Sequence, residues 1–79
     1  MKEDDQRAVV CGGDPENYLK AYFKGLYFDM DDKEEIKIIG LKEKFSMGRE
    51  TIEGIANKSH LTLFDYSENG KDIYIYLRK

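Results

Sequence analysis

The most constraining feature of this sequence is the pair Asn69-Gly70, which stands between two strongly β-forming runs, Leu61 to Tyr66 and Ile73 to Leu77. A two-residue Asn-Gly loop between alternating apolar runs is the clearest short-range signal of a β-hairpin. We therefore predict a hairpin over residues 61–79 with Asn69 and Gly70 at its turn.

A two-residue loop at this position would also fix which residues face each other across the two strands. On one face, which is nearly all apolar and is predicted to be core, the pairs would be Tyr66 with Ile73, Phe64 with Ile75 and Thr62 with Leu77. The opposite face would carry Leu61, Leu63, Tyr74 and Tyr76. Because tyrosine is enriched at protein interfaces, Tyr74 and Tyr76 are candidate partner-binding residues.

Residues 14–30 have the pattern of an amphipathic helix. Asp14 suits the N-cap position, and Pro15 suits the first helical position, where its missing N–H costs nothing. Apolar side chains then recur at spacings of three and four: Tyr18, Leu19, Tyr22, Phe23, Leu26, Tyr27 and Met30. Lys20 and Lys24 lie on the opposite side, so this stripe is predicted to face the core.

The middle of the chain allows two interpretations. Asp32 and Glu35 have the spacing of a capping box, which favours a helix start, and residues 48–59 have a helical apolar pattern. We therefore predict a helical region over residues 32–59. The β-branched run at residues 35–39 would also make a strand, giving a third strand and two helices. Both outcomes are α+β, with two or three helices packed on an antiparallel sheet.

Five carboxylates are concentrated within seven residues: Asp29, Asp31, Asp32, Glu34 and Glu35. A calcium loop starting at Asp29 would need glycine at its sixth position and a carboxylate at its twelfth, and these positions are Glu34 and Gly40. Helix capping would explain about half of the acidic side chains. The remaining acidic side chains repel one another, which leaves room for a functional role in meeting a basic partner or in a weak metal site.

Length and charge restrict the class of protein. A chain of 79 residues, 41% hydrophobic and 37% charged, is predicted to form one domain over residues 1–79, with residues 1–6 as a disordered tail. No stretch is long and apolar enough for a signal peptide or a membrane span, and the single cysteine, Cys11, forms no internal disulfide. We therefore expect a soluble, cytoplasmic protein.

Residues that would support catalysis or a cofactor are scarce. The sequence has no glycine-rich phosphate loop, and one cysteine with one histidine is too few for a zinc site built from four such ligands. The carboxylates cluster on an expected helix start rather than in a cleft. We expect no catalytic residues, no metal and no cofactor.

The segment from Leu41 to Ile55, followed by the hairpin, resembles the winged helix-turn-helix family over residues 36–79. The resemblance rests on the apolar positions Leu41, Phe45, Met47, Ile52 and Ile55, and on Asn69-Gly70-Lys71 as the tip of a wing. It implies a DNA-binding transcription regulator whose second helix reads the major groove. The residues at the matching positions are Arg49, Asn57, Lys58 and Lys71.

The charge of the chain disagrees with DNA binding. The formal net charge is −3 and the isoelectric point is about 5.1, whereas proteins that bind phosphates generally carry a basic surface. Glu50 and Glu53 would also lie on the helix expected to face DNA.

We therefore expect a non-catalytic protein-binding module, a small acidic regulator or inhibitor. It resembles inhibitors encoded by phages and mobile elements in size and charge. Its expected partner is a protein with a basic, nucleic-acid-binding site. Direct DNA binding is the alternative, and a homodimer is possible under either interpretation.

Overall fold

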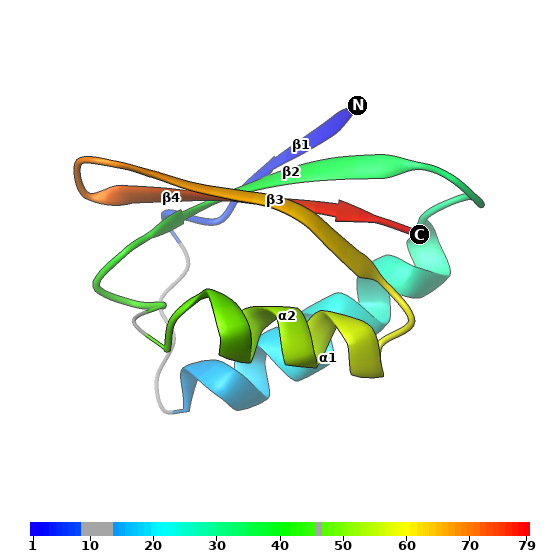
Figure 1. Ribbon diagram of the computed structural model, residues 1–79, viewed down its shortest axis with the longest axis horizontal. Helices are drawn as coiled ribbons and strands as arrows, with labels where there is room; N and C mark the ends of the chain where they lie inside the picture. Colours follow the sequence, from blue (N-terminus) through cyan, green and yellow to red (C-terminus); the bar gives the residue numbers. More distant parts are fainter. Residues whose placement is uncertain (9–13, 46) are drawn as a thin grey trace.

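The computed structural model describes residues 1–8, 14–45 and 47–79; Cys11 lies outside these ranges. The elements follow in the order β1 (Lys2–Asp5), α1 (Pro15–Asp29), β2 (Glu35–Leu41), α2 (Arg49–Lys58), β3 (Thr62–Asn69) and β4 (Asp72–Arg78). The strands form one sheet with the order β1-β2-β4-β3, and both helices cover the same face of it (Figure 1). The fold class is α+β, as the sequence predicts.

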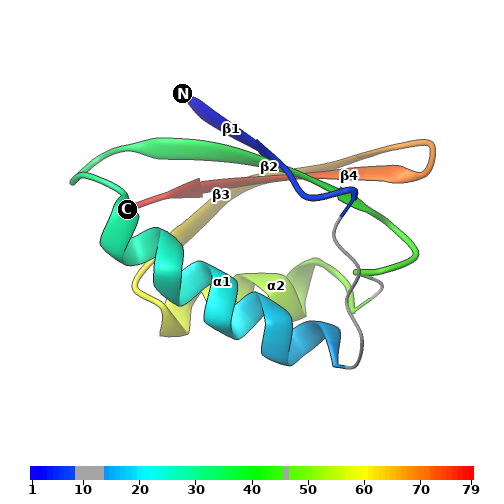
Figure 2. The ribbon, with the colours of Figure 1, turned by 180° about the vertical axis from the view of Figure 1, so that it is seen from behind.

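The sheet is mixed rather than purely antiparallel. β1 pairs with β2 in parallel, and α1 makes the crossover between them. β4 pairs antiparallel with both β2 and β3, so β3 runs in the same direction as β2. The second crossover, through α2, returns the chain on the same side of the sheet as α1 (Figure 2). Within residues 1–8, 14–45 and 47–79, no helix or strand covers the outer face of the sheet.

Helix α1 begins and ends close to the predicted positions. The side chain of Asp14 caps it by accepting a hydrogen bond from the Glu16 backbone N–H at 2.9 Å, and Pro15 occupies the first turn. Leu19, Phe23 and Leu26 are its buried residues, as the apolar spacing requires. The predicted helix over residues 14–30 is thus confirmed.

The prediction of a helical region over residues 32–59 is wrong for its first part, and the alternative of a strand is confirmed. Glu35–Leu41 form β2, a central strand between β1 and β4. Ile36 and Ile38 face the helices, while Ile39 is buried on the other face. Burial on both faces gives a central strand a nearly continuous apolar run, which periodicity alone does not separate from a helix. The capping box at Asp32 and Glu35 does not form.

The hairpin is confirmed, but its register differs from the prediction. Asn69 pairs with Asp72, so the two-residue loop is Gly70-Lys71. Gly70 has φ 62°, which suits the glycine at the first position of a type II′ turn. An irregularity between Leu63 and Asp65 then shifts the pairing by one residue. As a result, Leu63 lies opposite Leu77 in the core, and Phe64 is partly exposed.

Two further expectations need correction. The expected tail over residues 1–6 contains β1, and the Gln6 backbone N–H continues its pairing by donating to Ile39 O at 2.8 Å. The winged-helix resemblance also implied a helix before Met47. In the structure the strand β2 is followed by a turn at residues 42–44, and α2 starts at Arg49.

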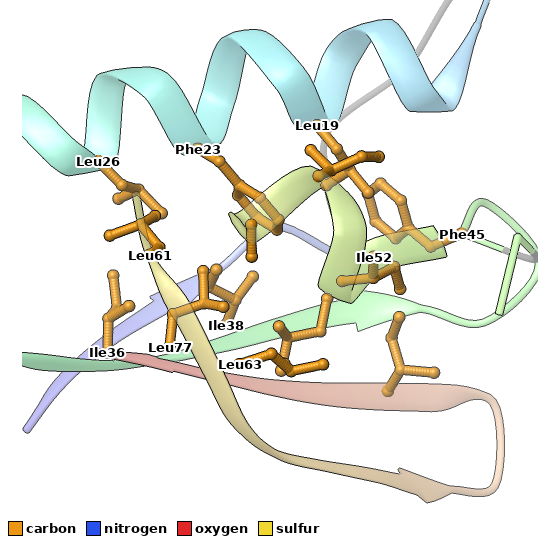
Figure 3. Packing of buried hydrophobic residues seen from close by; sticks show 14 of the residues in the cluster. Leu19, Phe23, Leu26, Ile36, Ile38, Phe45, Ile52, Leu61, Leu63 and Leu77 are labelled. Atoms are coloured by element: carbon orange, nitrogen blue, oxygen red, sulfur yellow. The ribbon is translucent and has the colours of Figure 1, made fainter. Parts of the chain in front are cut away.

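The hydrophobic core lies between the helices and the inner face of the sheet. Figure 3 shows Leu19, Phe23 and Leu26 pointing from α1 toward Ile36, Ile38 and Leu77 on the strands. The side chains of Phe23, Ile52, Ile73 and Leu77 are fully buried, and no polar or charged residue is buried among the described residues. Side-chain burial on this scale, at about 25 cal/mol per Å² of apolar area, is the main stabilising term for so small a domain.

Candidate functional site

The acidic segment from Asp29 to Glu35 divides into two parts in the structure. Glu35 accepts hydrogen bonds from Arg78, at 2.7 Å from Nη2, across the β2–β4 pair. Glu34 Oε1 is buried and lies 3.2 Å from the ammonium of Lys2, an ion pair that does not meet hydrogen-bond geometry. These two carboxylates are therefore largely occupied in holding strand ends together.

The other three carboxylates remain available. Asp29 ends α1, and Asp31 and Asp32 follow in the loop before β2. All three are exposed, and none forms an ion pair with a residue in the ranges 1–8, 14–45 and 47–79. We call these three residues the acidic loop. It is the part of the predicted cluster whose charge is not compensated.

The predicted interface on the hairpin is only half present. Leu61 and Leu63 are 1% and 5% exposed and belong to the core, because of the register shift. Tyr74 and Tyr76 do lie on the outer face of the sheet, and both are half-buried. They point away from the helices because Ile73, Ile75 and Leu77 alternate with them into the core.

Cations and rings cover the outer face around the two tyrosines. The Lys37 ammonium lies 4.6 Å from the centre of the Tyr74 ring, and the Arg78 guanidinium lies 4.8 Å from the centre of the Phe64 ring. Phe64 in turn contacts Tyr76, with their ring centres 6.0 Å apart. We call Lys37, Phe64, Tyr74, Tyr76 and Arg78 the outer aromatic face. The Glu35–Arg78 ion pair connects it to the end of the acidic segment.

The residues of the DNA-binding alternative are spread over the length of α2 and the tip of the hairpin. Arg49 begins α2 and Lys58 ends it, which separates them by about 13 Å along the helix axis. Asn57 is exposed beside Lys58. Lys71 lies at the hairpin tip, at the opposite end of the molecule from the C-terminal end of α2 in both ribbon views (Figures 1 and 2).

Sequence reasoning missed a groove between the C-terminal halves of the two helices. Its volume is about 560 Å³, and it is lined by Lys20, Lys24, Tyr27, Phe28, Ile55, Lys58, Ser59 and His60. Its signal in the sequence is a second stripe on α1, in which Lys20, Lys24 and Phe28 recur every four residues outside the core stripe. The contribution of α2 is set by helix packing and has no signal in sequence spacing.

Two titratable side chains, Asp5 and Tyr22, take part in contacts that join β1 to the rest of the fold. Hydrogen bonds from the Arg7 side chain and backbone hold the pKa of Asp5 down to about 2. Arg7 also contacts Asp72 at the start of β4. Tyr22 donates a hydrogen bond to Asp4, and burial followed by this bond raises the pKa of Tyr22 above its usual range. Asp5 and Tyr22 therefore have partners within the fold that account for the shifts in their pKa values.

Neither a cluster of metal ligands nor a membrane-spanning helix occurs in the described part of the chain. Within it, no three histidine, cysteine or carboxylate side chains come together as metal ligands. Neither α1 nor α2 has the length and apolar character that a membrane span requires.

Comparison with known proteins gives no independent indication of function. The sequence matches no protein-family model, and a search of curated proteins finds no significant match.

Proposed function

We propose that this protein is a non-catalytic protein-binding module, an acidic regulator or inhibitor that docks on a basic surface of a partner protein. The observation that carries this proposal is the acidic loop, in which Asp29, Asp31 and Asp32 are exposed and form no ion pair with a described residue. Three adjacent carboxylates repel one another, and this cost is offset when a basic partner covers them.

The outer aromatic face supplies the contact area that the charges lack. Two helices cover one face of the sheet, while Tyr74 and Tyr76 stand on the face without a covering layer. Tyrosine rings bury a large area with few rotatable bonds, which makes them effective at interfaces. Charges steer the encounter, and the ring surface stabilises the bound state.

The partner surface that fits this arrangement is one rich in lysine and arginine. Such surfaces occur where proteins bind nucleic acid, because phosphate neutralisation supplies much of that affinity. A protein whose exposed carboxylates lie a few residues apart along the chain, as in the acidic loop, would compete with nucleic acid for such a surface. The proposed activity is therefore occupation of a nucleic-acid-binding site on another protein.

Charge reversal of the acidic loop tests the proposal. The variant Asp29→Lys, Asp31→Lys, Asp32→Lys is compared with wild type in affinity capture from the native host, with captured proteins quantified by mass spectrometry. We expect at least one nucleic-acid-binding protein to be retained by wild type and to fall by about tenfold or more with the variant, a loss of roughly 1.4 kcal/mol.

A matched variant controls for the change in net charge. Glu16→Lys, Glu43→Lys, Glu50→Lys reverses three exposed carboxylates elsewhere and should leave capture unchanged. Circular dichroism establishes that both variants fold. Equal capture by all three proteins would contradict the role of the acidic loop.

Duplex DNA binding at low salt separates this proposal from the winged-helix alternative. We expect no binding, because the net charge is −3 and Glu50 and Glu53 lie between Arg49 and Lys58 on α2. Nanomolar binding that weakens steeply with added salt would establish the DNA-binding regulator instead.

A further inference from the structure

The groove between α1 and α2 has a charge opposite to that of the acidic loop. Lys20 and Lys24 border it from α1, and Lys58 borders it from the end of α2. None of the three lysines forms an ion pair with another residue in the part of the chain that the structure describes. No aspartate or glutamate lines the groove.

The groove also exposes an aromatic ring. Phe28 is 71% exposed, and Met1 is the other large hydrophobic residue that the described ranges expose. An exposed phenylalanine ring leaves apolar area in water, and binding against an apolar side chain would bury that area. Phe28 contacts the edge of Tyr27, with ring centres 5.5 Å apart, so the two rings form a continuous apolar surface.

The wall of the groove is fixed by contacts from distant parts of the chain. The Lys79 ammonium lies 4.4 Å from the centre of the Tyr27 ring and donates a hydrogen bond to Met30 O at 2.8 Å. His60 packs on Tyr27, with ring centres 5.6 Å apart. Ile55, 5% exposed, borders the groove from α2. Tyr27 is therefore held in place before any ligand arrives, which lowers the entropy cost of binding.

We propose that this groove binds a short acidic segment of a partner protein, with carboxylates beside Lys20, Lys24 and Lys58 and one apolar side chain against Phe28. A volume of about 560 Å³ accommodates a few side chains of such a segment. The row of exposed lysines that borders the groove on α1 is also short. Along α1 it is bounded by Glu16 before Lys20 and by Asp29 after Phe28.

This boundary favours a peptide over a nucleic acid. A strand that stacks on Phe28 would carry its phosphates past Asp29 or Glu16, and the molecule as a whole has a net charge of −3. Polyanion binding needs a positive field over many phosphates, whereas a short peptide senses the local lysines. The groove is lined by no residue of the acidic loop or of the outer aromatic face, so this inference does not depend on the proposed function.

Nuclear magnetic resonance titration of the whole protein tests the inference. The probe is a short synthetic peptide of aspartate and glutamate with one central phenylalanine, added at low ionic strength. We expect amide shifts confined to the residues around Lys20, Lys24, Phe28, Lys58 and His60. Salt should weaken the binding, because the charges are exposed.

Two variants separate the charged and apolar contributions. Phe28→Ala and the double variant Lys20→Gln, Lys24→Gln should each lower the affinity by about tenfold. Glutamine matches lysine in helix propensity, so the fold is preserved. The control Lys71→Gln removes an exposed lysine elsewhere, and should bind as wild type does.

Three outcomes would overturn the inference. They are the absence of shifts at millimolar peptide, shifts centred on the sheet, and unchanged affinity in both groove variants. Tighter binding of a single-stranded thymidine oligonucleotide than of the peptide would also overturn it, in favour of a nucleic-acid groove.

Discussion

At the scale of single residues, Gly40 makes room for an aromatic ring in the core. A Cβ atom at this position would lie 2.8 Å and 2.9 Å from two ring carbons of Phe45. Phe45 is itself 4% exposed and stacks on Tyr18, with ring centres 6.1 Å apart. The ring therefore covers the backbone of β2 where a side chain would otherwise stand.

We expect Gly40→Ala to destabilise the fold by about 1–3 kcal/mol, since the ring must move within a packed core. Urea unfolding followed by circular dichroism measures the change. The control is Gly25→Ala on the exposed side of α1, where a Cβ meets nothing within 4 Å. It should stabilise the helix by up to about 1 kcal/mol. A Gly40→Ala protein as stable as wild type would show that Phe45 does not pack on this glycine.

At the scale of elements, β1 depends on two tyrosines of α1. Tyr22 donates a hydrogen bond to Asp4, and Tyr18 donates one to Gln6 at 2.5 Å. Since β1 has only four residues and an exposed edge, its pairing with β2 alone gives limited stability. The tyrosine contacts connect the edge strand to the helical layer.

We expect Tyr22→Phe to lower the free energy of unfolding by about 1 kcal/mol, because the Asp4 carboxylate loses its donor in a partly buried place. Hydrogen exchange should speed up in β1 more than in β4. Tyr76→Phe is the control, because the Tyr76 hydroxyl makes no hydrogen bond within the described ranges. If β1 exchanges equally fast in both variants, the tyrosine contact does not hold the strand.

At the scale of the whole molecule, two shifted pKa values make the stability depend on pH, that of Asp5 in acid and that of Tyr22 in alkali. The pKa of Asp5 is about 2 in the folded state, whereas an unfolded aspartate titrates near about 4. The Arg7 contact therefore stabilises the fold above about pH 4 and is lost as the pH falls toward 2. Asp5→Asn should be less stable than wild type at neutral pH, with a difference that shrinks through this range in denaturant titrations.

The pKa shift of Tyr22 acts at alkaline pH and in the opposite direction, because stability falls there as the pH rises. The folded state raises the pKa of Tyr22, so an unfolded chain releases the tyrosine proton near about pH 10 while the folded protein retains it. Stability is then lost as the pH rises above about 10. Tyr22→Phe should flatten this decline when unfolding is measured between neutral and alkaline pH. An equally steep decline in the variant would assign it to other groups.

The whole molecule also presents two surfaces of opposite sign that adjoin at the C-terminal end of α1. The acidic loop begins at Asp29, and the lysine-lined groove includes Phe28, the residue before it. The net charge of −3 does not reveal this division of charge. The expected basic partner and the inferred acidic segment would therefore contact different residues of neighbouring surfaces.

The sequence by itself determined the elements whose signals are local. Asp14 and Pro15 mark the start of α1 because capping depends on adjacent residues, and the apolar spacing of three and four marks its buried side. The hairpin was predictable because Gly70 is needed in its turn. The acidic loop was predictable as a group of charges, since exposure of charged side chains is their default state.

Only the tertiary structure decided the properties that arise between distant residues. The central place of β2 in the sheet made residues 35–41 a strand, because burial on both faces outweighed a local capping signal. Packing of Leu63 on the core side shifted the hairpin register by one residue. Arg78 neutralised Glu35 from 43 positions away, and the α1–α2 contact created the groove. These contacts join residues that are far apart in the sequence, so no short stretch of sequence contains the pattern that would predict them.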